Sequence, residues 1–189
     1  MDAKDMATPQ GGARGFPDYR DSLEVAGTLV TIRTIRPADR DIEQQFVRGL
    51  SPASRYYRFH SALKELTPAM LERFTQVNYP DEMALIAIVP EGGGEREIGV
   101  ARYARFPGTD RAEVAVVVAD AWQGQGIGAR LLLDLRNLAR DAGIRQFEAS
   151  VLPGNKRMLK LARELGFTVR PAKPGAGAAL ELGKDFADE

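Results

Sequence analysis

The segment from residue 114 to residue 130 reads VAVVVADAWQGQGIGAR and joins an apolar strand to a Leu-rich helix through a glycine-dense turn. Glycine lets the backbone approach a ligand without a Cβ collision. The amides that open the following helix have no intrahelical partner, so they attract anions. The segment therefore predicts a cradle for the pyrophosphate of a cofactor.

The spacing of the glycines distinguishes between families of phosphate-binding turn. A P-loop requires a Lys directly after its last glycine, and no Lys follows any glycine in this turn. The dinucleotide-binding fingerprint is closer, because Gly124, Gly126 and Ala129 satisfy its relaxed form. Glu148 also lies about twenty residues further on, where an acid would bind the ribose. However, residues 120–123 separate the strand from the turn and too little chain follows for a doubly wound sheet, so this fingerprint stays an alternative.

Two motifs resemble the GNAT superfamily of N-acetyltransferases. Gln123, Gly126 and Gly128 follow the acetyl-CoA-binding pattern Gln-x-x-Gly-x-Gly, after a Val-rich strand. Residues 153–167, PGNKRMLKLARELGF, resemble the later motif of that superfamily, in which an Asn begins a helix that ends in Gly-Phe. The two motifs occur in the right order and at the right spacing, which is more specific than either alone.

Upstream segments narrow the resemblance to the Pat-like protein lysine acetyltransferases. They are residues 31–39 (TIRTIRPAD), 50–59 (LSPASRYYRF) and 81–87 (DEMALIA). The resemblance implies a GNAT fold of the α+β class, a mixed central sheet flanked by helices with two splayed parallel strands holding acetyl-CoA. It also implies a lysine acceptor on a protein such as an acyl-CoA synthetase. Such domains are often fused to a nucleotide-sensing module, which we do not expect in 189 residues.

The resemblance also assigns cofactor contacts. Backbone groups of Val116 and Val118, with Val117 between them, are expected along the pantetheine arm. The amides expected to take the pyrophosphate are those of Gln123, Gly124, Gln125, Gly126, Ile127 and Gly128. Asn155 is expected to bond the arm near the acetyl end, although Asn after Pro-Gly is also a favoured helix cap, and the two roles remain open.

Glu113 is the candidate general base. A Lys amine of pKa ~10.4 is mostly protonated at pH 7, so a carboxylate must take a proton before the amine attacks the thioester. Glu113 begins the cofactor strand, at the place of the Pat-like base, and burial would raise its pKa. The alternative is an exposed Glu paired with Arg111 or Arg102. We expect direct attack, with an amide near residues 116–118 stabilising the oxyanion, and no acetyl-enzyme because the chain has no Cys.

The segment 55–60, RYYRFH, lies where GNAT domains build the acceptor site. Its Tyr and Arg side chains could line that site. Alternatively, Tyr56 and Phe59 at helical spacing would be core and Arg58 would form an ion pair, and we favour core for Phe59. Many GNAT enzymes carry a Tyr as general acid where this chain has Ala162. A thiolate of pKa near 8.5 can leave without it.

Composition suits one compact domain, with 44% hydrophobic and 28% charged residues. The formal net charge is zero, which argues against nucleic acid or an anionic membrane as partner. Arg33, Arg36 and Arg40 could contact a phosphate, but we expect them on a solvated face. With no Cys and one His, we expect no metal, and the resemblance implies acetyl-CoA as co-substrate. The most apolar run, residues 83–89, is too short to span a bilayer. We expect a cytoplasmic protein that is a monomer or a homodimer.

Residues 1–21 are polar and aperiodic and predict a flexible leader, and residues 22–189 are expected to form a single GNAT domain. Apolar alternation predicts a strand over residues 28–36, and apolar, strand-like runs predict further strands over 83–89, 98–106, 113–118, 145–151, near 167 and over 178–182. Helical spacing and capping residues predict helices over residues 37–49, from 51, over 67–77, 126–142 and 155–165.

Two other functions would use the same cofactor motifs. One is a small-molecule amine N-acetyltransferase, for which an enclosed, acid-lined acceptor pocket would argue. An open groove would instead favour a protein acceptor. The other is a non-catalytic acyl-CoA-binding sensor, which would bind the cofactor without turnover.

Overall fold

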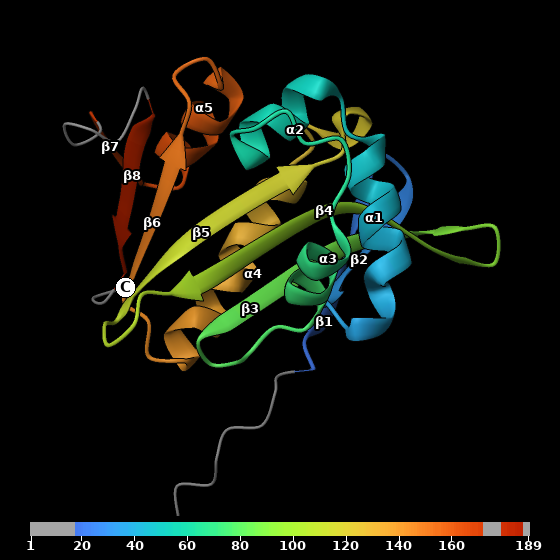
Figure 1. Cartoon of the computed structure of the whole chain (residues 1–189), viewed down its shortest axis with the longest axis horizontal. Helices are drawn as coiled ribbons and strands as arrows, with labels where there is room; N and C mark the ends of the chain where they lie inside the picture. The colour runs from blue at the N-terminus through green and yellow to red at the C-terminus, as the bar shows by residue number, and fades with distance from the viewer. Residues whose placement is uncertain (1–17, 172–178, 187–189) are drawn as a thin grey trace, which may run out of the picture.

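The computed structural model describes residues 18–171 and 179–186, which form one eight-stranded sheet with helices on both faces (Figure 1). The strand order is β1-β2-β3-β4-β5-β6-β8-β7. The strands are β1 (Arg20–Val25), β2 (Thr28–Thr34), β3 (Glu82–Glu91), β4 (Gly94–Arg105), β5 (Arg111–Val118), β6 (Gln146–Val151), β7 (Thr168–Pro171) and β8 (Leu180–Asp185). Neighbouring strands are antiparallel except β5 and β6, which are parallel. The predicted mixed sheet is confirmed.

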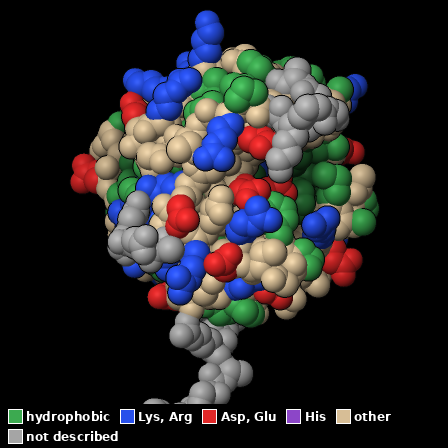
Figure 2. All heavy atoms as spheres, turned by 90° about the vertical axis from the view of Figure 1, so that its left-hand side faces the viewer, with side chains coloured by type: hydrophobic (Ala, Val, Ile, Leu, Met, Phe, Trp, Pro, Cys, Tyr) green, Lys and Arg blue, Asp and Glu red, His purple; other side chains and the backbone are tan. Residues whose placement is uncertain are grey.

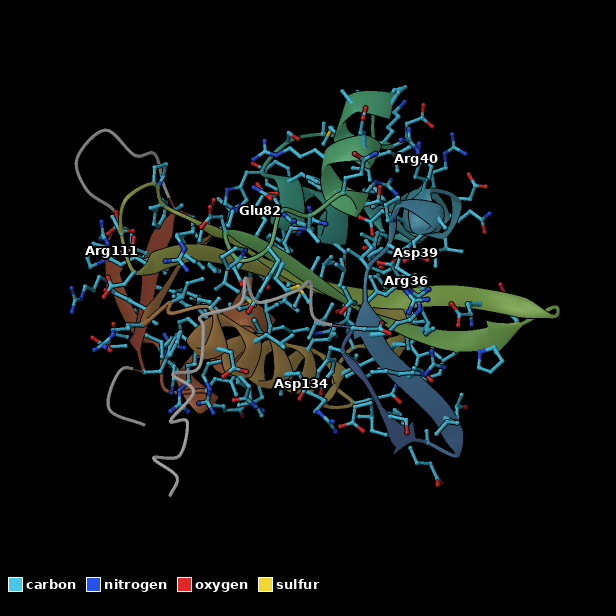
Figure 3. The ribbon with its side chains drawn as sticks, turned by 90° about the horizontal axis from the view of Figure 1, so that it is seen from below. Arg36, Asp39, Arg40, Glu82, Arg111 and Asp134 are labelled. Atoms are coloured by element: carbon cyan, nitrogen blue, oxygen red, sulfur yellow. The ribbon has the colours of Figure 1, made fainter. Side chains whose placement is uncertain are left out.

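The helices form two layers around this sheet. They are α1 (Arg40–Gly49), α2 (Pro52–Phe59), α3 (Pro68–Thr75), α4 (Ile127–Asp141) and α5 (Lys156–Glu164), with 3₁₀ turns η1 (Pro37–Asp39) and η2 (Asp120–Trp122). Figure 3 shows α1, α2 and α3 above one face of the sheet and α4 below the other, where Asp134 is labelled. Alternate residues of β3 enter the two cores, so its apolar run is continuous: a strand covered on both faces has no polar side.

The helix starts follow from local chemistry. The hydroxyl of Ser51 accepts a hydrogen bond from the Ser54 amide at 3.1 Å, and Thr67 accepts one from the Met70 amide at 3.3 Å. A proline follows each cap, where its missing N–H costs nothing. At the C-terminal end of α4, Gly143 has a left-handed φ of +80° and ends the helix, as the sequence predicts.

β1 is a strand that the sequence analysis did not predict. It begins at Arg20, inside the segment expected as a leader; residues 1–17 of that segment lie outside the described residues. A two-residue turn joins it to β2, with Ala26 and Gly27 at φ of +47° and +78°. A glycine in a tight turn between two apolar runs was the available signal. The last predicted strand is also shifted and appears as β8, while residue 178 is outside the described part.

The parallel strands β5 and β6 start together and then separate. The paired residues of the two strands run from Arg111 with Gln146 to Glu113 with Glu148, although β5 continues to Val118. On its other edge β6 pairs with β8 along its whole length, and Figure 1 shows β5 leading toward α2 while β6 leads toward α5. The predicted splay is therefore present, and it leaves one edge of β5 available to a ligand.

The surface agrees with the balanced charge of the sequence. Figure 2 shows the left-hand face of the Figure 1 view, on which blue and red side chains are interspersed. In the described part of the chain, no helix is long and apolar enough to cross a membrane. Among the same residues, no group of three or more His, Asp or Glu side chains is arranged to hold a metal ion.

Candidate active site

The free edge of β5 presents the backbone of alternate residues. On the β4 side, the Arg111 carbonyl accepts a hydrogen bond from the Phe106 amide at 2.9 Å, and the Ala119 amide donates one to the Ile98 carbonyl at 2.8 Å. Because backbone groups alternate in direction along a strand, those of Val116 and Val118 face the splayed gap. Those of Val117 face β4, and its side chain packs in the core under α1 and α3. The structure thus brings the first two predicted residues to the gap by their backbone and leaves Val117 outside it.

The three glycines of the turn differ in the physical constraint that favours glycine. Gly124 and Gly126 have φ of +76° and +86°, in the left-handed region that side chains disfavour. A Cβ on either would meet no protein atom within 4 Å, so the space beside them is open. A Cβ on Gly128 would lie 3.5 Å from Leu161 and 3.6 Å from Val118, where it touches packed side chains. Only Gly124 and Gly126 therefore border the open space of the predicted cradle.

The side chain of Gln123 ties the turn to its surroundings. Its Nε2 donates to the carbonyl of Val118 at 3.0 Å and to the hydroxyl of Ser54 at 3.2 Å, and its Oε1 accepts from Arg157 at 2.6 Å. Its backbone N–H bonds the carbonyl of Asp120 at 3.4 Å. That amide is already used within the turn, which leaves the next five predicted amides, Gly124 to Gly128, as the candidates for pyrophosphate.

Asp120 fixes α2 to the same turn. Its carboxylate accepts from the Ser51 amide at 2.8 Å, the Ser51 hydroxyl at 2.7 Å and the Ser54 hydroxyl at 2.8 Å. Burial alone would raise the pKa of Asp120, but these hydrogen bonds outweigh it and the pKa lies below its usual value. The sequence analysis did not foresee this contact, because it joins residues far apart in the chain.

Asn155 caps α5. Its Oδ1 accepts a hydrogen bond from the Met158 amide at 3.1 Å, which confirms the cap; the cofactor contact stays a prediction. The residue before it is Gly154, where a Cβ would lie 3.2 Å from the hydroxyl of Tyr57 on α2. α2 therefore approaches the start of α5 closely, across the end of the splayed strands.

Glu113 is exposed and has no hydrogen bond or ion pair with any residue that the structure describes. The proposed structural partners are engaged elsewhere: Arg111 bonds Glu148 at 2.7 Å, and Arg102 donates to the carbonyl of Phe74 at 2.8 Å. The alternative of a surface ion pair is therefore wrong. The expected burial is also absent from the protein alone, so bound substrates would have to supply it.

A cavity of about 210 Å³ lies between the sheet and helices α2 and α3, and Glu113 is part of its wall. Its charged lining residues are Arg58, Arg73, Arg102, Glu82 and Glu113. Figure 3 labels Glu82 on the side of the sheet that carries α2 and α3. The sequence analysis had named Glu113, Arg58 and, as an alternative partner of Glu113, Arg102, but not Arg73 of α3 or Glu82 of β3.

The aromatic and basic segment of α2 divides between core and cavity. The ring of Phe59 stacks on Phe74 with centroids 6.4 Å apart, so its core role is confirmed. Tyr56 is 49% exposed, so its predicted core role is wrong. Arg58 lines the cavity and forms no ion pair with a described residue, which contradicts the predicted salt bridge. Ala162 is fully buried on α5.

The upstream basic residues serve the fold. Arg33 is only 4% exposed and bonds Asp39 at 2.7 and 2.8 Å and Glu95 at 2.7 Å. These partners raise the pKa of Arg33, chiefly through the Asp39 hydrogen bonds. Figure 3 shows Arg36, Asp39 and Arg40 around the start of α1. A solvated face is correct for the exposed Arg36 and wrong for Arg33.

Behind the cavity, Glu43 on α1 and Glu97 on β4 form a buried carboxyl pair, each 2% exposed. No described side chain or amide bonds Oε2 of Glu43 or either oxygen of Glu97. Burial and the nearby Glu43 raise the pKa of Glu97 well above its usual value. The sequence analysis did not predict this pair.

The raised pKa makes stability depend on pH. The folded protein holds the Glu97 proton more tightly than the unfolded chain, so the free energy of unfolding falls as pH rises above the ordinary Glu pKa. We expect Glu97→Gln to raise the Tm at pH 8 by about 2–4 °C for each kcal/mol gained, with the difference disappearing near pH 4. Thermal unfolding of both proteins between these values measures it. Exposed Glu164→Gln is the control, and an equal Tm difference at both pH values would contradict the assignment.

Residues 30–168 match the family described as the Acetyltransferase (GNAT) domain. The chain belongs to the GNAT acetyltransferase family. The GNAT domain of S. lividans PAT superposes with a TM-score of 0.80 at 31% identity, over 88% of this chain and 97% of that domain. The likeness identifies a Pat-like member with the GNAT fold, and GNAT enzymes use acetyl-CoA.

Other relatives agree with the family. Acetyltransferase PA5475 of Pseudomonas aeruginosa is 40% identical over 141 residues, covering 75% of this chain and 76% of that protein. Acetyltransferase Pat of Mycolicibacterium smegmatis is 34% identical over 141 residues, 74% of this chain. The match spans only 41% of Pat. The structure of yncA from Salmonella typhimurium with its cofactor acetyl-CoA has a TM-score of 0.64 at 22% identity over 85% of this chain and 95% of that one, which supports the fold alone.

Proposed function

We propose that this GNAT acetyltransferase transfers the acetyl group of acetyl-CoA to the ε-amine of a protein lysine, with Glu113 as general base. The observation that carries the proposal is the position of Glu113. It lies on β5, at the last recorded pair before the strands separate, and in the wall of the cavity beside α2 and α3. A base there can reach an amine in the cavity and a thioester in the gap.

The reaction then follows from groups on β5 and the cofactor. The neutral amine attacks the acetyl carbon after Glu113 has taken its proton, directly or through one water. The Val116 amide, whose direction is toward the gap, is the candidate donor to the oxyanion. The C–S bond breaks as the intermediate collapses, CoA leaves as a thiolate of pKa near 8.5, and the remaining extra proton on the attacking nitrogen passes to solvent or to that thiolate. No acid is therefore required at the position of the buried Ala162.

The size of the cavity supports a lysine acceptor over a drug-sized molecule. Its volume of about 210 Å³ is below the ~300–1,000 Å³ of typical small-molecule sites. It is bordered by the exposed side chains of Arg73 and Glu113, so a side chain could enter from solvent. The similarity to Pat is consistent with this class of acceptor, for which an acyl-CoA synthetase is the first candidate.

Thiol release from acetyl-CoA tests the proposal, with a disulfide dye as reporter and an acyl-CoA synthetase as acceptor. The chain has no Cys, so it adds no background of its own. We expect release that requires the active-site lysine of the acceptor and mass spectrometry that finds acetyl on it. Release with small amines alone would favour a small-molecule enzyme, and tight binding of acetyl-CoA without any release would favour the sensor.

A further inference from the structure

The acceptor cavity carries more cations than carboxylates. Guanidinium groups reach it from three elements: Arg58 on α2, Arg73 on α3 and Arg102 on β4. Its acidic lining residues are Glu82 and Glu113. A site built only for the ammonium group of lysine would be expected to show the opposite balance, because like charges repel the substrate.

Arg58 is partly buried, and its guanidinium lies 5.0 Å from the centre of the Phe59 ring. A guanidinium has five N–H donors, and those of Arg58 find no acceptor among the described residues. Burial and the nearby Arg102 together lower the pKa of Arg58 to about 10, against the opposing effect of Glu43 and Glu113. Partial removal of a charge from water without a hydrogen-bonding partner is unfavourable, so an anionic ligand group would be bound favourably here.

The other two arginines of the cavity differ in how many contacts they make with the rest of the protein. Arg102 donates to the carbonyl of Phe74 at 2.8 Å, and its guanidinium lies 4.1 Å from the centre of the Phe74 ring. This fixes it as part of the wall. Arg73 is exposed and has no hydrogen bond or ion pair with a described residue, so it stands at the entrance. Arg58 and Arg73 are therefore the pair available to a ligand.

We propose that this cavity recognises an amine with a carboxylate beside it, in which Arg58 and Arg73 bind the carboxylate and Glu113 receives the amine. This inference rests on the proposed acetyl transfer and adds the class of acceptor: a lysine that neighbours Asp or Glu in a polypeptide. A free amino acid presents the same pair of groups from a second source. The planar fork of arginine suits a carboxylate because it can bond both oxygens.

Binding of two product peptides tests the inference without requiring turnover. Both contain Nε-acetyl-lysine and differ only in Glu or Gln as its neighbour, and both are titrated into the full chain with CoA. We expect the Glu peptide to bind about 10- to 100-fold more tightly, as hydrogen bonds to a charged partner imply. In Arg58→Gln the two dissociation constants should converge. Arg48→Gln, on the exposed side of α1 and bonded to Glu65, should keep the preference.

Each outcome of these titrations has a defined meaning. Equal binding of the two peptides to the wild type, no binding of either peptide, or an unchanged preference in Arg58→Gln would overturn the inference. If Arg58→Gln does not fold, exposed Arg73→Gln replaces it, with an expected loss of preference of about 3- to 10-fold. A preference in binding without acetylation of the matching lysine peptide would preserve the anion site and reject the proposed lysine acceptor. Free lysine compared with lysine amide then identifies an amino-acid acceptor.

Discussion

Replacing Glu113 with Gln is expected to lower the turnover rate at pH 7 by at least about 100-fold, with the dissociation constant of acetyl-CoA unchanged. General-base catalysis contributes about 10²- to 10⁴-fold, and the amide of Gln cannot accept the proton. Gln keeps the size of the side chain, which has no hydrogen bond or ion pair with a described residue, so the fold should not change. Steady-state thiol release and acetyl-CoA titration measure the two quantities.

The pH dependence sharpens this test. Without its base the variant must use amine that is already neutral, whose fraction rises about tenfold per pH unit below the Lys pKa of ~10.4. The rate of Glu113→Gln should therefore climb from pH 7 to pH 9 more steeply than that of the wild type. Glu148→Gln is the matched control, since it faces Glu113 in the strand register but is paired with Arg111. A wild-type rate in Glu113→Gln would remove Glu113 from the mechanism.

Gly126→Ala is expected to weaken acetyl-CoA binding by about 10- to 100-fold. The residue caps the N-terminus of α4 at φ +86° beside open space, where a ligand would approach the backbone. A methyl group there would keep the pyrophosphate from the helix amides, and losing a hydrogen bond to a charged group costs about 1.5–3 kcal/mol. Calorimetric titration of acetyl-CoA into both proteins measures the effect.

Gly143→Ala separates lost binding from backbone strain. Gly143 lies at the other end of the same helix, with φ +80° and no atom within 4 Å of an added Cβ. Both variants should lose about 1–2 kcal/mol of stability from the left-handed conformation. Only Gly126→Ala should lose affinity for acetyl-CoA. Equal affinities in the two variants would show that the turn does not hold the cofactor.

The sequence predicted most elements because their signals are local. Caps at Ser51 and Thr67, the continuous apolar run of β3, and Gly143 after α4 each act within a few residues. β1 was missed because its first two residues were placed in the predicted leader and residues 22–25 were assigned to no element. The splay of β5 from β6 was expected from resemblance alone, since periodicity does not reveal where two strands stop pairing.

The acceptor side could not be predicted in the same way. Glu113 was found from its place on β5, but whether it was paired depended on Arg111 and Arg102, which the fold directs elsewhere. The buried pair of Glu43 and Glu97 left no trace in the sequence, because a charged residue on a helix normally indicates a solvated face. Long-range packing decided these cases.

By itself, the sequence determined the conformation of the glycine turn that we expect to hold the cofactor. Gly124 and Gly126 reach their conformation through their own lack of a side chain, and the amides of α4 point outward in any helix N-terminus. Only the tertiary structure decided the acceptor cavity, because Arg58, Arg73 and Arg102 belong to separate elements. Their three positive charges come together only after α2 and α3 have packed over the sheet. The glycine turn depends on local backbone conformation, whereas the proposed choice of acceptor depends on this long-range packing.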